Sequence, residues 1–182
     1  MLLLCQPACL CVFLLNSIIY PHYVAHCHHR WRGSRLFCCH CRKETNPHAK
    51  VTIFEKAGRV LAKVGVSGGG RCNLTNSFEE ITDLKQAYPR GDKLLKRLFK
   101  SFDHKDAYRW FEEHGVKLTT QADQCVFPVS QDSQTVIDCL THTASKLGVE
   151  VKTHYALEAV EPLSDGRLEA RFKAHGSETS TE

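Results

Sequence analysis

The chain has 182 residues, which is the length of one ordinary domain or of a fragment of a larger one. Its 24 basic and 20 acidic side chains are interspersed and give a formal net charge of only +4, so the sequence lacks the dense basic footprint of a nucleic-acid-binding protein. A hydrophobic content of 42% is enough for a folded core.

The cysteines divide the chain into two kinds of sequence. Seven of the ten lie at or before Cys41, and the others are Cys72, Cys125 and Cys139. A disulfide framework normally spreads its cysteines through the fold that it stabilises. We therefore separate an apolar and Cys/His-rich segment, residues 1–42, from residues 43–182.

Residues 1–20 are mostly apolar and are interrupted by Gln6, Pro7 and Asn16. A segment of this kind is a candidate signal peptide or membrane anchor. However, no basic segment precedes the apolar run, and a membrane span needs about 20 nearly uninterrupted apolar residues. We expect a cytoplasmic protein without membrane association, and association with a membrane through residues 1–20 is the alternative.

Residues 26–41 are rich in cysteine and histidine, which are the usual zinc ligands. Structural zinc sites use ligand pairs separated by about two to four residues, and adjacent Cys38 and Cys39 fit that spacing poorly. We expect no metal site here. A secreted or membrane-anchored metal-binding protein that uses this segment is an alternative from a different functional class.

A third interpretation of the same segment concerns its reading frame. The codons of residues 30–35 can all carry guanine at the second position, so a shift by one base lets each new codon begin with guanine. With permitted codon choices, residues 29–41 then become a Gly-x-Gly-x-x-Gly turn that opens a helix, the first half of a dinucleotide-binding βαβ unit. Our hypothesis is that residues up to about Arg42 are translated out of frame, and the nucleotide sequence of the gene tests it.

From residue 43 onward the sequence alternates strand and helix signals. Residues 50–56 are β-branched and aromatic and carry the acidic Glu55 near their end, which predicts a buried parallel strand. Apolar side chains at helical spacing between capping residues predict the helices. In chain order we expect a helix at 92–100, a helix capped by Asp103 and ended by Gly115, strands at 116–118 and 125–129, a helix capped by Ser133 and ended by Gly148, strands at 149–151 and 156–160, and a hairpin turn at Asp165-Gly166 into a strand at 168–172.

The stretch Ser67-Gly68-Gly69-Gly70-Arg71-Cys72-Asn73 carries the most specific chemical signal. Successive glycines expose backbone N–H groups, which can form a concave anion cradle, and the guanidinium adds a planar charge-assisted donor. A ligand with phosphates, or a polar ring that the backbone approaches closely, explains this composition. The alternative is a flexible surface turn.

Other reactive side chains are predicted to have ordinary structural roles. His104, His114, His142 and His154 have no acid or cysteine partner at an interpretable spacing, so we expect solvated or capping histidines. Cys72 lies beside a cation that favours a thiolate, but no Cys-x-x-Cys partner accompanies it, and we expect a packing role. No catalytic residue is identified.

Taken together, residues 51–56, 61–76 and 126–130, the last reading Val-Phe-Pro-Val-Ser, resemble a family of bacterial flavoproteins. These are the NAD(P)/FAD-dependent oxidoreductases of the aminoacetone-oxidase type, whose relatives include bile-acid reductases. The resemblance extends from about residue 46 to residue 160. It implies an α/β fold, here an incomplete Rossmann-like FAD-binding domain over residues 43–182 with a parallel sheet, helices and a small β-hairpin region. It also implies FAD as cofactor and hydride transfer with a nicotinamide cofactor, NAD(P)H.

The resemblance further implies a set of cofactor-binding residues. Glu55 would bind the adenosine ribose, and the backbone of Leu157 would meet the adenine edge. Lys63 and residues 67–73 would line the pyrophosphate and flavin side. The complete set is Glu55, Lys56, Lys63, Ser67, Gly68, Gly69, Gly70, Arg71, Cys72, Asn73 and Leu157.

Two departures from the family bear on activity. The glycine-rich turn expected before Lys50 is absent from the translated chain, and the chain stops before the later substrate domain. We therefore expect an FAD-binding oxidoreductase fragment that is inactive by itself and retains flavin weakly. A non-catalytic nucleotide-binding module is the remaining alternative. We expect a small-molecule substrate.

Overall fold

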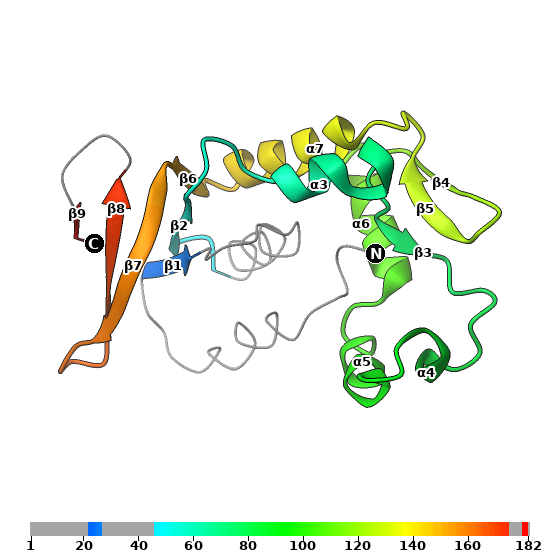
Figure 1. The fold of residues 1–182 in the computed structure, drawn as a ribbon, viewed down its shortest axis with the longest axis horizontal. Coiled ribbons are helices and arrows are strands. Elements are labelled where there is room, and N and C mark those ends of the chain that lie inside the picture. The colour runs from blue at the N-terminus through cyan, green and yellow to red at the C-terminus, as the bar shows by residue number, and fades with distance from the viewer. Residues whose placement is uncertain (1–21, 27–45, 175–179, 182) are drawn as a thin grey trace. The chain divides into compact units, whose positions relative to one another are not determined.

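The computed structural model describes residues 22–26, 46–174 and 180–181 (Figure 1). The chain forms two units. Among the described residues, the sheet unit comprises 22–26, 46–63, 140–174 and 180–181, and the loop unit comprises 64–139. The fold is α/β with a parallel sheet, helices and a β-hairpin, as the sequence predicts.

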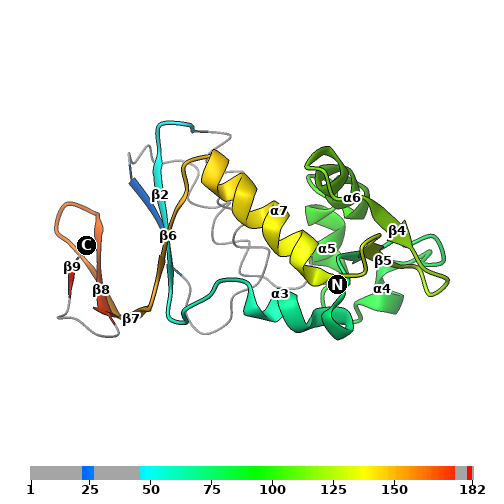
Figure 2. The ribbon, with the colours of Figure 1, turned by 90° about the horizontal axis from the view of Figure 1, so that it is seen from above.

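A parallel sheet forms the first layer of the sheet unit (Figure 2). Its strands are β1 (His22–His26), β2 (Lys50–Glu55) and β6 (Glu150–Thr153), and β2 lies between the other two. β2 is buried from its second residue to its end, as expected for a central strand that is covered on both faces. The strand predicted at 50–56 is thus confirmed to within one residue, and β1 extends the sheet into residues 1–42.

An antiparallel hairpin completes the core of the sheet unit. β7 (Tyr155–Pro162) pairs with β8 (Leu168–Ala174), which in turn pairs with β9 (Ser180–Thr181). Gly166 has a φ of +83°, which the predicted Asp-Gly turn requires. The ring of Phe172 stacks on that of Phe54 from β2, with centroids 4.0 Å apart. The predicted hairpin is therefore confirmed.

Helix α7 (Ser133–Lys146) is capped by Asp132, one residue before the predicted cap. The carboxylate of Asp132 accepts the amide of Gln134 at 2.8 Å, whereas buried Ser133 donates its hydroxyl to the carbonyl of Gly65 at 3.0 Å. The prediction that Ser133 is the cap is wrong, because both adjacent residues are good caps and tertiary packing uses the serine. The helix ends at Lys146, and the predicted Gly148, with φ +70°, follows in the turn that terminates it.

In the loop unit, three short strands form an antiparallel sheet. β3 (Thr75–Asn76) and β4 (Leu118–Thr120) flank β5 (Cys125–Pro128). Two short helices, α4 (Leu84–Ala87) and α5 (Asp92–Leu98), lie between β3 and the longer helix α6 (His104–Glu113) in the sequence. The helix at 92–100 and the strand at 125–129 are confirmed with shorter bounds, whereas α4 was not predicted.

Helix α6 has the predicted ends. Asp103 accepts the amide of Asp106 at 3.0 Å, and Asp106 accepts the amide of Asp103 at 2.9 Å, which forms a reciprocal capping box. Beyond the helix, Gly115 has a φ of +86° and the amide of Val116 bonds to the carbonyl of Phe111 at 2.9 Å. Val116 therefore belongs to the helix-terminating turn, and the strand predicted at 116–118 begins only at Leu118.

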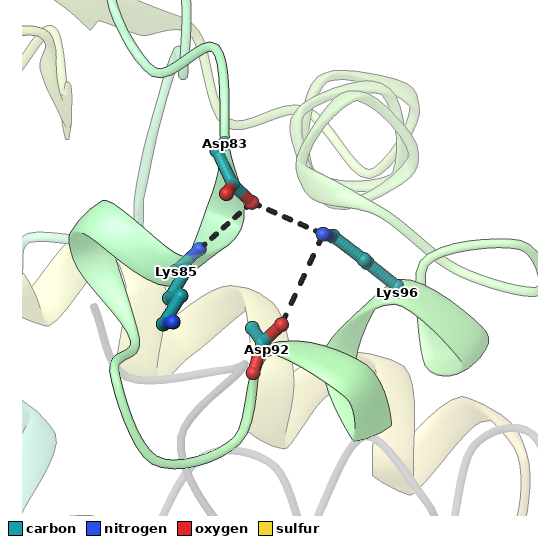
Figure 3. A network of polar contacts seen from close by, with 4 residues as sticks. All are labelled: Asp83, Lys85, Asp92 and Lys96. Atoms are coloured by element: carbon teal, nitrogen blue, oxygen red, sulfur yellow. Dashed lines mark hydrogen bonds and ion pairs between the residues drawn. The ribbon is translucent and has the colours of Figure 1, made fainter.

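An exposed polar network links α4 and α5 (Figure 3). Asp83 caps α4 by accepting the amide of Lys85 at 3.2 Å, and it also pairs with Nζ of Lys96 at 3.0 Å. Lys96 is in addition 3.9 Å from the carboxylate of Asp92. The backbone hydrogen bond and the nearby ammonium group lower the pKa of Asp83.

Several predictions concern segments that the structure does not describe. The candidate anchor at 1–20, the out-of-frame hypothesis and nearly all of the Cys/His-rich stretch at 26–41 lie outside the described residues. Within residues 22–26, 46–174 and 180–181, no helix has the length and hydropathy of a membrane span. Over the same ranges, no group of three His, Cys, Asp or Glu side chains could hold a metal ion.

Candidate functional site: a buried acid and a glycine loop

The acid at the end of β2 is buried but only partly satisfied. Glu55 is 7% exposed, and its Oε1 accepts the amide of Ala57 at 2.7 Å. No residue within the described part of the chain donates a hydrogen bond to its Oε2, which is also buried. Burial raises the pKa of Glu55, and the backbone amides of Ala57 and Lys56 offset part of that rise. A buried acceptor of this kind fits a ligand that brings a hydroxyl donor.

The chain bends directly after Glu55, at the carboxyl edge of the parallel sheet. Glu55 is in register with Thr153 of β6, and the carbonyl of Ala57 accepts the amide of His154 at 3.3 Å. A methyl group at Gly58 would lie 2.9 Å from Cε1 of His154. The imidazole therefore packs on the turn that follows the acid. Carboxyl edges of parallel strands are the common position of ligand sites in α/β sheets.

The other predicted residues of the sheet unit are less constrained. Lys56 is exposed directly after the strand, and Lys63 is exposed in the short helix α3 (Ala62–Val66). Leu157 is half-buried in β7, opposite Phe172 at a register irregularity. Its assignment to the adenine edge stays a prediction.

The glycine loop, residues 67–73, has a backbone that ordinary residues adopt with difficulty. It opens with the short 3₁₀ helix η2 (Ser67–Gly70), in which Gly68, Gly69 and Gly70 have φ values of +56°, +67° and +87°. A methyl group at Gly68 would lie 2.7 Å from the amide nitrogen of Asn73, whereas one at Gly69 or Gly70 would meet no atom within 4 Å. The close approach to Asn73 thus requires a glycine at position 68, whereas Gly69 and Gly70 are required only by their backbone conformation.

Two of the amides expected to face a ligand are used inside the loop. The amide of Cys72 bonds to the carbonyl of Ser67 at 3.0 Å, and the amide of Arg71 approaches the carbonyl of Gly68 at 3.4 Å. The next residues join the small sheet, since the amide of Leu74 bonds to the carbonyl of Val126 at 2.9 Å. The predicted cradle is therefore narrower than the sequence suggests and does not include these two amides.

Arg71 has a defined position over an aromatic ring. Its guanidinium carbon lies 4.2 Å from the ring centroid of Phe127, and its Nε donates to the carbonyl of Gly68 at 3.2 Å. Its Nη1 donates to Oε1 of Gln131 at 3.2 Å and approaches Oε1 of Gln121 at 3.5 Å. Sequence reasoning missed both glutamines, because they lie 50 and 60 residues away from the arginine.

Cys72 has the packing role that the sequence favours. It is 1% exposed, and burial raises the pKa of its thiol despite a hydrogen bond from Ser67. A protonated and inaccessible thiol is a poor nucleophile and a poor redox group. Two histidines are structural in the same sense: His114 stacks on Trp110 and bonds to its carbonyl at 2.7 Å, and burial lowers the pKa of His104, which packs on Phe78.

Comparison with known proteins places these features in a family context. The family model described as "HI0933-like protein Rossmann domain" matches residues 33–182. A 3-dehydro-bile acid delta(4,6)-reductase from Clostridium scindens is 25% identical over 118 residues, which are 65% of this chain and 28% of the reductase. The crystal structure of Thermovibrio ammonificans THI4 superposes with a TM-score of 0.53 at 12% identity, over 92% of this chain and 54% of that one. The chain thus spans about a quarter of the reductase and about half of THI4.

Proposed function

The chain belongs to the HI0933-like Rossmann-domain family, and from this premise we propose that it is the dinucleotide-binding part of an FAD-dependent oxidoreductase. The matched region is only 28% of the reductase relative, so the activity of the whole protein is itself part of what we propose. The family and the α/β fold make a flavin nucleotide the best-supported ligand. The residues of this chain support the same choice.

One observation carries the proposal. Oε2 of Glu55 is buried at the carboxyl end of a central parallel strand and receives no hydrogen bond from any described residue. A buried carboxylate oxygen without a donor is costly, and the ribose hydroxyls of an adenine dinucleotide supply donors at this position in Rossmann-type domains. An acid with only a structural role would be expected to bond through both oxygens or to lie in solvent.

The glycine loop supports the phosphate end of the same proposal. Its glycines keep Cβ atoms away from a ligand, and the ion pairs of the described residues do not involve Arg71. A guanidinium with neutral neighbours is a strong partner for a phosphate. We propose that Ser67–Gly70 and the side chain of Arg71 contact the pyrophosphate.

When bound, FAD supplies hydride acceptance and donation at its flavin ring. The residues of this chain bind and orient the adenosine and diphosphate, so the chain contributes placement of the cofactor. We propose NAD(P)H as electron donor and a small-molecule substrate, both of which meet the rest of the enzyme. None of the described side chains is assigned a proton-transfer role.

The test is a titration of the purified chain with FAD, followed by flavin fluorescence and visible absorbance. We expect saturable binding that ADP competes for, although too weak to retain flavin through purification. Glu55→Ala should weaken FAD binding about tenfold or more, because it removes an acceptor of charge-assisted hydrogen bonds. Glu158→Ala, which removes an exposed acid from the same unit, is the matched control and should leave the affinity unchanged.

The alternatives give different results in the same titration. Equal affinity for FAD, ADP and unrelated nucleoside diphosphates would favour a non-catalytic nucleotide-binding module. Absence of FAD binding to the unmodified chain at millimolar concentration would refute the proposed function. An unchanged affinity in Glu55→Ala would remove the observation on which the proposal depends.

A further inference from the structure

Arg71 keeps an uncompensated positive charge. Its hydrogen-bond acceptors are one backbone carbonyl, of Gly68, and two side-chain amide oxygens, of Gln121 and Gln131. Over residues 46–174, no carboxylate forms an ion pair with it, and no described residue accepts a hydrogen bond from Nη2. The Nη2 group therefore offers two N–H donors on a full positive charge.

The ring of Phe127 fixes the plane of that guanidinium. Phe127 is buried in β5, and the guanidinium carbon lies 4.2 Å from the ring centroid, a distance at which the cation is attracted to the ring face. The same ring explains a glycine in the loop, since a methyl group at Gly68 would lie 3.0 Å from its Cε1. Loop and ring are therefore in close contact, and the arginine covers the ring.

The amide group of Gln131 has its orientation set by a second contact. Its Nε2 donates to the carbonyl of Pro128 at 3.0 Å, and its backbone amide donates to the same carbonyl at 2.9 Å. With the nitrogen engaged there, Oε1 faces Arg71 and accepts Nη1 at 3.2 Å. Nε2 of Gln121 also approaches this oxygen, at 3.4 Å. Gln131 adopts a left-handed backbone, φ +55°, in making these contacts.

A neutral acceptor leaves the positive charge of a guanidinium available to a ligand, whereas a carboxylate cancels it. A glutamine satisfies a guanidinium N–H and fixes its direction without cancelling the charge, whereas a glutamate at the same place would form an ion pair and compete with an anionic ligand. Arg71 has three neutral neighbours, the ring of Phe127 and the two glutamines. They hold the guanidinium in place and leave its positive charge available to an anionic ligand.

We propose that Phe127, Gln121 and Gln131 are positioning residues that hold Arg71 uncompensated, so that its Nη2 edge binds a phosphate of the adenine dinucleotide. This inference rests on the proposed function for the identity of the ligand. The arrangement itself predicts affinity for a diphosphate group with or without the nucleoside. It assigns a role to the Phe-Pro segment of β5 and to the loop that follows it.

The decisive variant is Gln131→Glu in the full chain. Glutamate keeps the size of the side chain and its reach to Nη1, but it converts the contact into an ion pair. We expect FAD and inorganic diphosphate each to bind about tenfold more weakly or worse to the folded variant, which also loses the hydrogen bond from Nε2 to the carbonyl of Pro128. The matched control is Gln86→Glu, which makes the same charge change at an exposed position of α4. It should change neither affinity by more than about twofold, because exposed charges are screened by salt.

A second substitution separates position from charge. Gln131→Met removes the acceptor and stays neutral, so we expect a loss smaller than that of Gln131→Glu and an unchanged salt dependence of binding. If Gln131→Glu does not fold, Gln121→Glu makes the same test at the other glutamine. Equal losses in Gln131→Glu and Gln86→Glu would overturn the inference.

The two probes keep this inference apart from the proposed function. If the unmodified chain binds diphosphate but not FAD, the proposed function fails and the inference is judged on diphosphate alone. If it binds FAD and Gln131→Glu leaves both affinities unchanged, the proposed function stands and the inference fails. If it binds neither, both fail.

Discussion

The two units present their ligand-binding candidates by different means. In the sheet unit, Glu55 follows a regular hydrophobic strand, and its position is set by the parallel pairing of β2 with β1 and β6. In the loop unit, Arg71 follows three glycines with positive φ and is held by side chains 50 and 60 residues away. The position of the acid is therefore set by the local hydrophobic pattern of its strand, whereas the position of the cation is set by contacts with residues distant in the sequence.

The electrostatic environments of the two candidates are also opposite. Glu55 is a buried acid with a raised pKa and one oxygen without a donor, and Arg71 is a partly exposed cation with neutral partners. Among the residues that the structure describes, one oxygen of Glu55 lacks a hydrogen-bond donor and Arg71 lacks a counter-charge, and a ligand could supply either. Hydroxyl donors suit the first, and phosphate oxygens suit the second.

The core of the sheet unit should show the largest effect. Phe54 is fully buried and stacks on Phe172 at 4.0 Å, so Phe54→Ala removes a ring from β2 and from the hairpin contact. We expect a loss of about 3–5 kcal/mol in the free energy of unfolding, measured by urea denaturation. Phe111→Ala, in the core of the loop unit, should cost a similar amount. A loss below about 1 kcal/mol for Phe54→Ala would contradict the packing described for this unit.

The glycine loop should respond next, and unequally along its length. Gly68→Ala combines a φ of +56° with a methyl group 2.7 Å from a backbone nitrogen, so we expect a loss of about 2–3 kcal/mol. Gly70→Ala has a φ of +87° but open space around the new methyl group, so only about 1 kcal/mol should be lost. Thermal unfolding of both variants checks the difference. Equal losses would mean that backbone conformation alone, and not the close approach to Asn73, requires the glycine.

The comparison also explains how far sequence reasoning could reach. The strand at 50–56 and the capping box of Asp103 were predictable because short-range apolar pattern and local hydrogen bonding define them. The start of α7 was misplaced by one residue, because the packing of Ser133 on Gly65 cannot be read from two adjacent capping residues.

The candidate site was predictable only in outline. Its acid and its glycines stand out in the sequence, but the left-handed conformations of Cys72 in the loop and of Gln131 beside Arg71 do not. Such conformations are uncommon outside glycine, asparagine and aspartate, so residue type gives little warning of them. The partners of Arg71 were missed because they come from elements distant in sequence.

Glu55 gives a smaller effect that depends on pH. Its pKa in the folded state is raised from 4.5, so folding is favoured by the protonated form, and this stabilisation is lost as the pH rises through the folded-state pKa. Glu55→Gln mimics the protonated acid and keeps an acceptor for the amide of Ala57. We expect its melting temperature to exceed that of the unmodified chain at neutral pH and to match it well below pH 4.5. The same variant should bind FAD more weakly at neutral pH, and a loss of both stability and affinity would contradict this account.

The smallest effect is expected at the exposed network between α4 and α5. Lys96 pairs with Asp83 at 3.0 Å and lies 3.9 Å from Asp92, but its side chain is 53% exposed and its charge is screened. Lys96→Met should therefore leave the melting temperature nearly unchanged, and salt should remove whatever difference remains. Asp83→Ala should be more harmful, because it also removes the acceptor for the amide of Lys85 at the start of α4. The lowered pKa of Asp83 predicts that this advantage is present above pH 3.8 and is lost as the pH falls through the folded-state pKa. If Lys96→Met were as destabilising as Asp83→Ala, the ion pair between Lys96 and Asp83, and not the cap of α4, would stabilise this region.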